Sequence, residues 1–209
     1  MKKTVVLSSI FCFLFLWASV SFSQEVVAPI YQEGDWWKIN VEVRYGTGVS
    51  KSGYCDEAYS EYMVKVDQGQ KKIYGIKDEK QEQLNCPDIL EQLLGIETDA
   101  EPNSQKYLVY PLAAGRTWTA QVAEERERKT KTKRANVRWL NLEYKVLGWE
   151  SVKTPKGQLG AFKIEVSGWP WGRPPTYYYS PNAKAIVRLR EQKERVTRIV
   201  TLLDYSVTK

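Results

Sequence analysis

The stretch LNLEYKVLGWESVKTPKGQLGAFKIEV, residues 140–166, shows most clearly how this chain folds. Apolar side chains alternate with polar ones from Leu140 to Val146, and again from Phe162 to Val166. Alternation with a period of two is typical of strands that bury one face and expose the other. Between the two runs lies TPKG, residues 154–157, where proline fixes φ and glycine supplies a positive φ. The pattern predicts two antiparallel strands joined by a turn.

The same alternation recurs along the rest of the chain. It predicts further strands over residues 36–45, 59–66, 71–77, 106–112, 116–123, 176–180, 185–191 and 196–207. Residues 85–95 differ, with apolar residues three to four apart, a proline near the start and a terminal glycine, and these features predict one short helix. The sequence therefore predicts a mainly β fold: an antiparallel curled sheet or incomplete β-barrel of about ten strands with one short helix.

The first 23 residues are typical of a secretory signal peptide. The basic residues Lys2 and Lys3 are followed by an apolar run over residues 5–20 and by small residues before Gln24, where we expect cleavage. The alternative is a retained membrane anchor, although the run is short for a span. Residues 24–209 would then form a single β-rich domain, periplasmic or secreted, without an integral membrane span after cleavage.

Two cysteines remain after cleavage, Cys55 and Cys86. In an oxidising compartment such a pair favours one disulfide, which would tie the predicted helix to the region of Cys55. The alternative is a metal site, but the chain has no histidine and no further mature cysteine to complete a ligand shell. We predict a Cys55–Cys86 disulfide and no metal.

The composition excludes several classes of function. Because the chain contains no histidine, it lacks Ser-His-Asp and Cys-His catalytic arrangements and histidine-based zinc sites. The phosphate-binding motifs GxGxxG and GxxxxGK[ST] are absent, and no pair of carboxylates is placed to converge. Removing Lys2 and Lys3 lowers the formal charge from +6 to +4, a mild balance. We predict a non-enzymatic protein with no cofactor and no nucleic-acid partner.

Four aromatic residues form a candidate ligand-binding set: Trp169, Trp171, Tyr177 and Tyr179. Exposed rings on a loop stack on sugars or line the mouth of an apolar cavity. The alternative is that these rings close the end of the core, with the neighbouring prolines stiffening the loop. Tyr178 is expected to point away from Tyr177 and Tyr179, so part of the set at most shares a surface.

The most charged stretch lies between two predicted strands that together form one long hairpin over residues 116–146. Its cations form a candidate patch for an anionic partner: Arg126, Arg128, Lys129, Lys131, Lys133 and Arg134, with Arg138 nearby. The alternative is a solvated hairpin whose charges protect the strand edges, and Glu124, Glu125 and Glu127 offset part of the positive field.

Three segments resemble a group of uncharacterised exported bacterial β-proteins of domain-of-unknown-function families. They are YPLAAGRTW (residues 110–118), TPKGQLGAFKI (154–164) and YYYSPNAKAIV (177–187), and the resemblance covers residues 107–205. This chain departs from the common pattern at Tyr178, where tryptophan is frequent, and by the inserted pair Gln158-Leu159. The resemblance implies no catalytic residues. At the level of fold alone, the chain also resembles the curled half-barrels of periplasmic lipoprotein carriers, which hold acyl chains.

These observations lead to three functional hypotheses. The first is a non-enzymatic binding or carrier protein for an apolar or amphiphilic ligand in the cell envelope, with Trp37, Trp118, Tyr144 and Phe162 lining a cavity. The second is a structural or interaction module that binds an envelope protein through a sheet edge or the basic hairpin. The third is a hydrolase with two converging carboxylates in a cleft.

The sequence makes a prediction about the exported protein. When the chain is purified from the periplasm, we expect its N-terminus at Gln24 and its mass two hydrogens below that of the fully reduced chain. Intact mass spectrometry before and after reduction checks both points. A mass that includes residues 1–23 would contradict the cleavage, and an unchanged mass on reduction would contradict the disulfide.

Overall fold

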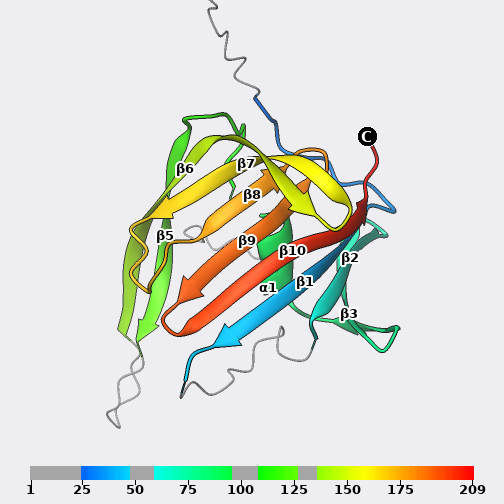
Figure 1. Cartoon of the computed structure of the whole chain (residues 1–209), viewed down its shortest axis with the longest axis horizontal. Coiled ribbons are helices and arrows are strands. Elements are labelled where there is room, and N and C mark those ends of the chain that lie inside the picture. The colour runs from blue at the N-terminus through cyan, green and yellow to red at the C-terminus, as the bar shows by residue number, and fades with distance from the viewer. Residues whose placement is uncertain (1–24, 48–58, 96–107, 127–135) are drawn as a thin grey trace, which may run out of the picture.

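The structure is a computed structural model that describes residues 25–47, 59–95, 108–126 and 136–209 (Figure 1). Its described part contains ten strands and one helix, α1 (Pro87–Leu94). The strands are β1 (Trp36–Tyr45), β2 (Glu61–Asp67), β3 (Gln70–Lys77), β4 (Lys80–Leu84), β5 (Thr117–Arg126), β6 (Asn136–Thr154), β7 (Gly157–Ser167), β8 (Thr176–Ser180), β9 (Ala185–Lys193) and β10 (Val196–Ser206).

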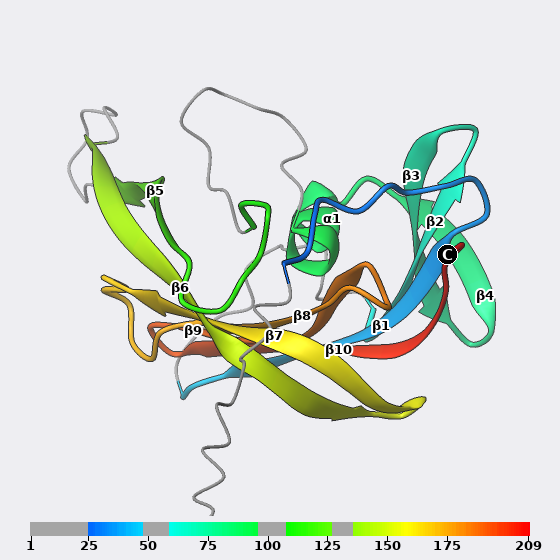
Figure 2. The same ribbon diagram turned by 90° about the horizontal axis from the view of Figure 1, so that it is seen from above.

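All ten strands pair antiparallel in one open sheet, in the order β4-β3-β2-β1-β10-β9-β8-β7-β6-β5. Most neighbours in the sheet are also neighbours in sequence, as in a meander. The exception is the central pair, in which β1 near the N-terminus pairs with β10 near the C-terminus, from Trp36 opposite Ser206 to Tyr45 opposite Val196. The sheet is open, and β4 and β5 are its two edges (Figure 2).

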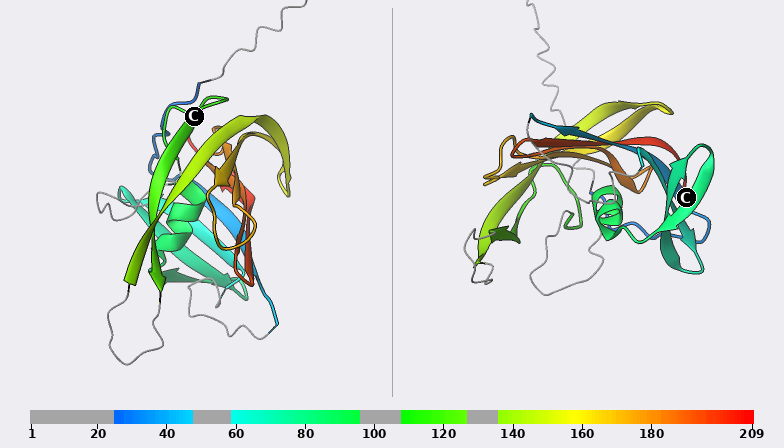
Figure 3. Two further views of the ribbon diagram at one scale, coloured as in Figure 1. Left: turned by 90° about the vertical axis from the view of Figure 1, so that its left-hand side faces the viewer. Right: turned by 90° about the horizontal axis from the view of Figure 1, so that it is seen from below.

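Helix α1 covers one face of the sheet, which we call the inner face. Figure 2 shows α1 on one side of the central strands, and the views of Figure 3 show the β5–β6 end and the β2–β4 end of the sheet on that same side. Ile89, Leu93 and Leu94 are buried between α1 and the sheet. The opposite face, which we call the outer face, is turned toward the viewer in Figure 1.

The inner face is a packed apolar core. Alternate residues of most strands point into it: in the first half of β1 every second residue is buried, and the strand contributes Trp37, Ile39 and Val41. Aromatic rings fill much of the volume: Tyr144 is fully buried and stacks on the partly buried Trp118, with ring centroids 5.3 Å apart. Stacked pairs of this kind stabilise a core by about 1 kcal/mol beyond the burial of their area.

The β6–β7 hairpin extends beyond the sheet and bends to the outer side (Figure 2). A register shift between Val146 and Gly148 marks the bend in β6, which is the usual effect of a β-bulge. At the tip, Lys156 forms an ion pair with Asp204 and donates a hydrogen bond to the carbonyl of Tyr205 (2.7 Å). These contacts fasten the hairpin tip to the end of β10.

A buried carboxylate ties three distant parts of the chain together. Asp35, which precedes β1, is 1% exposed. It accepts hydrogen bonds from the backbone N–H groups of Gln32 (3.0 Å) and Thr208 (2.7 Å), and its Oδ2 lies 3.3 Å from Nζ of Lys184. Burial alone would raise the pKa of Asp35, but these hydrogen bonds outweigh it and hold the pKa below its ordinary value.

The predicted fold class is confirmed: the described part of the protein is mainly β, with ten antiparallel strands and one short helix. The sheet is open and uncurled, so the expected curling toward an incomplete β-barrel is not found. Two details of the strand prediction are wrong. Residues 106–112 were expected to form a strand, but the described residues 108–112 form a loop with one isolated bridge, Val26 to Leu112. Strand β4 was missed, because its sequence KQEQL has no apolar alternation.

Two predictions fall on residues outside the described ranges. Residues 1–24 lie outside them, so the signal peptide stays a prediction. Cys86 is buried at the start of α1, but Cys55 lies outside the described residues, so the Cys55–Cys86 disulfide also stays a prediction. Within the described ranges, no helix has the length and hydropathy needed to cross a membrane.

The Asp35 contacts predict a site-specific loss of stability. The substitution Asp35→Asn removes the charge that pairs with Lys184 and weakens two backbone hydrogen bonds, so we expect it to lower the free energy of unfolding by about 2 kcal/mol at pH 7. In a chain of this size, that loss corresponds to a fall of about 4–8 °C in Tm. Thermal and urea denaturation measure the effect.

The same residue predicts how stability depends on pH. Because the pKa of Asp35 is lower in the folded chain, its contribution is fully present above the unfolded value of about 4 and is lost as the pH falls through the folded pKa. The difference between wild type and Asp35→Asn should therefore shrink below about pH 4. Asp78→Asn, at an exposed turn, is the matched control and should leave stability unchanged. A difference that is constant with pH would contradict the role of Asp35.

Candidate functional site: a cationic groove on the outer face

Polar side chains of three neighbouring strands lie side by side on the outer face of the sheet. The register aligns Lys163 of β7 with Tyr178 of β8, and Tyr178 with Arg188 of β9. In the next row of the same face, Glu165 aligns with Thr176, and Thr176 with Arg190. Side chains opposite one another on adjacent antiparallel strands are about 5 Å apart at Cβ, so the two rows form one continuous polar surface.

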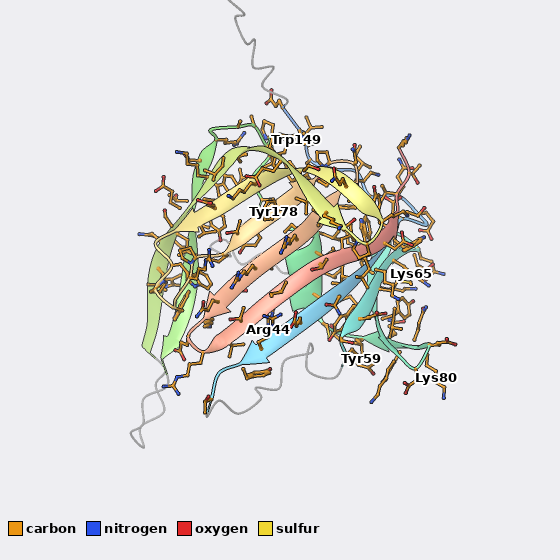
Figure 4. All side chains as sticks on the ribbon, in the orientation of Figure 1. Arg44, Tyr59, Lys65, Lys80, Trp149 and Tyr178 are labelled. Carbon is orange, nitrogen blue, oxygen red and sulfur yellow. The ribbon has the colours of Figure 1, made fainter. Side chains whose placement is uncertain are left out.

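These rows form the floor of a groove of about 270 Å³, which we call the arginine groove. Figure 4 places Tyr178 near the middle of the sheet, over these strands. The residues that line the groove are Lys163, Glu165, Arg173, Pro174, Thr176, Tyr178, Arg188, Arg190 and Gln192. The lining thus combines four cations with one carboxylate, and it includes the hydroxyl groups of Thr176 and Tyr178.

The four cations of the groove differ in their partners. Nζ of Lys163 lies 3.3 Å from Glu165 and 3.6 Å from Glu150, and the hydrogen bond to Glu165, together with the charge of Glu150, raises its pKa. The three arginines of the groove have no ion-pair or hydrogen-bond partner within the described residues. The groove therefore carries excess positive charge, and a guanidinium group donates its hydrogen bonds to carboxylates and phosphates in particular.

The loop over residues 168–175 brings Arg173 and Pro174 to the groove. Within it the Trp169 and Trp171 rings meet edge to face, with centroids 4.7 Å apart. Nε1 of Trp169 donates a hydrogen bond to the carbonyl of Gln192 (2.7 Å), and the carbonyl of Trp171 accepts one from the N–H of Glu194 (2.5 Å). The two tryptophans thus hold the wall of the groove against the β9–β10 turn.

The structure separates the four rings of the predicted ligand-binding set. Tyr177 and Tyr179 are each 1% exposed and point into the core, where Tyr179 meets Tyr110 edge to face at 5.8 Å. Trp169 is partly buried and Trp171 is buried, both in the loop beside the groove. The four rings therefore share no common surface, and a ligand contact for the two tryptophans stays a prediction.

The predicted anionic-partner patch lies almost entirely outside the described residues. Arg126 is the last residue of β5, whereas Arg128, Lys129, Lys131, Lys133 and Arg134 fall in the undescribed range 127–135. This patch stays a prediction. No group of three or more histidine, cysteine or acidic side chains in the described ranges has the arrangement of a metal site.

Sequence reasoning missed the residues that form the arginine groove. Arg188 and Arg190 do show a signal, since they alternate with Val187, Leu189 and Glu191 in the strand over residues 185–193. That pattern places both arginines on one face but does not show which other side chains lie beside them. The register of β9 with β8, and the position of the loop with Arg173, supply that information.

A second groove, of about 490 Å³, is lined by Lys38, Tyr59, Ser60, Glu61, Ile76, Lys77, Asp78 and Glu79. Here the acidic groups outnumber the basic ones, and Lys38 is already paired with Glu61 at 2.6 Å. Because one of its two cations is neutralised within the protein, this groove shows no comparable preference for an anion.

No protein-family model matches the chain, and none of the curated proteins matches its sequence. A solved structure, that of the hypothetical lipoprotein YmcC from Escherichia coli (K12), is similar with a TM-score of 0.37 and 9% sequence identity, over 83% of this chain and 86% of that chain. The motif resemblance to exported bacterial β-proteins stays a prediction.

The loop beside the groove predicts a contrast between two tryptophans. Trp171→Ala should lower the free energy of unfolding by about 3 kcal/mol, because it removes a buried ring and leaves a cavity beside Trp169. Trp139 is 53% exposed, so Trp139→Ala should cost less than about 1 kcal/mol. Urea denaturation of both variants measures the difference. Equal losses would show that Trp171 does not hold the loop.

Proposed function

We propose that this chain is a non-enzymatic binding protein of the cell envelope, periplasmic or secreted, which holds an anionic group of its partner in the arginine groove. The observation that carries the proposal is the convergence of Arg173, Arg188 and Arg190 on one groove without an anionic partner among the described residues. Opposite charges that are neighbours on a sheet face stabilise it, and Arg44 is paired in this way with Glu42. Three uncompensated guanidinium groups in one place therefore favour an external anion.

The shape of the groove also supports a role in binding. Its floor is a hydrogen-bonded sheet and its wall is a loop held by two tryptophans, so the backbone positions that carry its cations are fixed before a ligand arrives. Such preorganisation reduces the entropy that binding must overcome. A volume of about 270 Å³ suits one charged group and its immediate neighbours.

An apolar or amphiphilic ligand inside the fold has less support. Trp37, Tyr144 and Phe162, which would line its cavity, are between 0% and 2% exposed and pack in the core, while Trp118 stacks on Tyr144. An amphiphile would therefore have to be recognised by its charged end, at the arginine groove. The second hypothesis, a structural or interaction module, is compatible with the same groove. The groove would then receive an anionic group of an envelope protein.

The proposal predicts that the protein binds a polyanion through the groove. On immobilised dextran sulfate, the double variant Arg188→Gln/Arg190→Gln should bind at least about tenfold more weakly than wild type, because each charge-assisted hydrogen bond contributes about 1.5 kcal/mol or more. Binding should also weaken as salt is raised, since surface charges are screened. Neutral dextran should not bind. Surface plasmon resonance at several salt concentrations measures all three effects.

Two further variants locate the binding surface. Lys77→Gln/Lys80→Gln removes the same charge from exposed positions at the β3–β4 turn, remote from the groove, and should bind like wild type (Figure 4 labels Lys80). Lys129→Gln/Lys131→Gln/Lys133→Gln neutralises the basic segment of the sequence. If that variant loses binding while Arg188→Gln/Arg190→Gln retains it, the basic segment is the binding surface and the groove proposal is wrong.

A further inference from the structure

We infer that the anion received by the arginine groove is the phosphoryl group of a phosphate monoester. The inference rests on the proposed function and narrows it from an anionic partner to one chemical group. Three features of the groove support it: the charge of the groove, the directions from which its donors come, and its neutral hydroxyl groups.

The charge of the groove exceeds what one carboxylate would neutralise. Lys163 is paired with Glu165 and Glu150, but Arg173, Arg188 and Arg190 are not paired within the described residues. A carboxylate or a sulfate ester brings a single negative charge, whereas a phosphate monoester carries about −1.5 to −2 at pH 7. Of these groups, the monoester matches three guanidinium groups most closely.

The donors approach from different elements, which suits a tetrahedral group better than a planar one. Arg188 and Arg190 are two residues apart on one face of β9, a separation of about 6.6 Å along the strand. Arg173 comes from the loop at the wall of the groove. A carboxylate presents two oxygens in one plane, while a monoester presents three terminal oxygens that point in different directions.

Neutral donors lie between the charged residues of the groove. The hydroxyl-bearing residue Tyr178 lies between Lys163 and Arg188 in one row, and Thr176 lies between Glu165 and Arg190 in the next. Hydroxyl groups donate to phosphate oxygens without adding charge. They also accept hydrogen bonds, so the groove can contact a polar group attached to the phosphate, such as a sugar or glycerol.

The first test compares soluble ligands of matched structure by isothermal titration calorimetry. Glycerol 3-phosphate should bind at least about tenfold more tightly than glycerate or methyl sulfate, because of these three only the phosphate monoester combines a charge near −2 with three terminal oxygens. Equal affinity for glycerate and glycerol 3-phosphate would overturn this inference. It would leave the proposed function intact, provided that dextran sulfate binding still depends on Arg188 and Arg190.

The second test separates geometry from charge. Arg188→Lys/Arg190→Lys keeps both positive charges but loses the planar, bidentate guanidinium groups. Glycerol 3-phosphate affinity should fall about tenfold, while retention on dextran sulfate should change little. Far-ultraviolet circular dichroism and thermal denaturation of the variant show that its fold is retained. If neither ligand loses affinity, charge alone explains the binding and the phosphoryl assignment fails. An equal loss for both ligands also overturns it, because the guanidinium groups would then act alike on sulfate and phosphoryl groups.

The third test uses pH. The second ionisation of a monoester has a pKa of about 6, so affinity for glycerol 3-phosphate should fall several-fold between about pH 7.5 and 5. Glycerophosphocholine, a diester of constant charge, should show no such fall. The groups that face the ligand are Lys163 and Glu165 of β7, Tyr178 of β8, Arg188 and Arg190 of β9, and Arg173 of the loop, and the chain has no histidine. The same pH dependence for monoester and diester would overturn the inference.

A lipid headgroup and a soluble sugar phosphate present the same group, and vesicles distinguish them. The protein is sedimented with phosphatidylcholine vesicles that contain phosphatidic acid. If wild type sediments with them and Arg188→Lys/Arg190→Lys sediments less, the phosphoryl group belongs to a lipid. Binding of glycerol 3-phosphate without vesicle sedimentation would assign it to a soluble compound. Binding to neither probe would overturn the inference.

Discussion

The pairing of β1 with β10 holds the two halves of the sheet together. In the described part of the chain, it is the only pairing between the group β1–β4 and the group β5–β10. It extends over the whole of β1, from Trp36 to Tyr45, with one register shift after Lys38. Asp35 fixes the start of this pair, because it contacts the segment after β10 through Thr208 and the β8–β9 connection through Lys184. Loss of the pair would divide one ten-stranded sheet into two smaller sheets, each with an unprotected edge.

The position of the arginine groove follows from this arrangement. Strands β7, β8 and β9 lie in the interior of the sheet, so hydrogen bonds on both sides fix their backbones and therefore the spacing of the side chains on them. Tyr177 and Tyr179 anchor β8 in the core, while Tyr178 between them faces the groove. Successive side chains of a strand point to opposite faces, so a strand that buries every second residue presents the residues between them on its outer face. A site built on such elements is held more accurately than one built on loops alone.

The sequence predicted the strands with alternating side chains well, because burial of one face leaves a period of two in the residues. Strand β1 was predicted with its bounds, 36–45, and β8 with its bounds, 176–180. Strand β4 was not predicted, because KQEQL has no alternation of apolar and polar residues. Backbone pairing with β3 holds it at the edge of the sheet. Residues 108–112 are apolar enough for a strand, but Pro111 has no N–H to donate to a ladder. The groove itself depends on long-range register, and a local pattern carries no information about which cations meet across strands.

The β1–β10 pair also determines when the sheet can form. A ribosome makes residues 36–45 early and residues 196–206 almost last. One edge of β1 therefore has no partner strand until synthesis is nearly complete. Contacts between residues so far apart in sequence raise the contact order, and they slow folding relative to a plain meander of the same size. Until β10 arrives, the exposed edge of β1 is a surface on which other chains could pair. A nascent chain of this design therefore benefits from a holding chaperone until its last strand has been made.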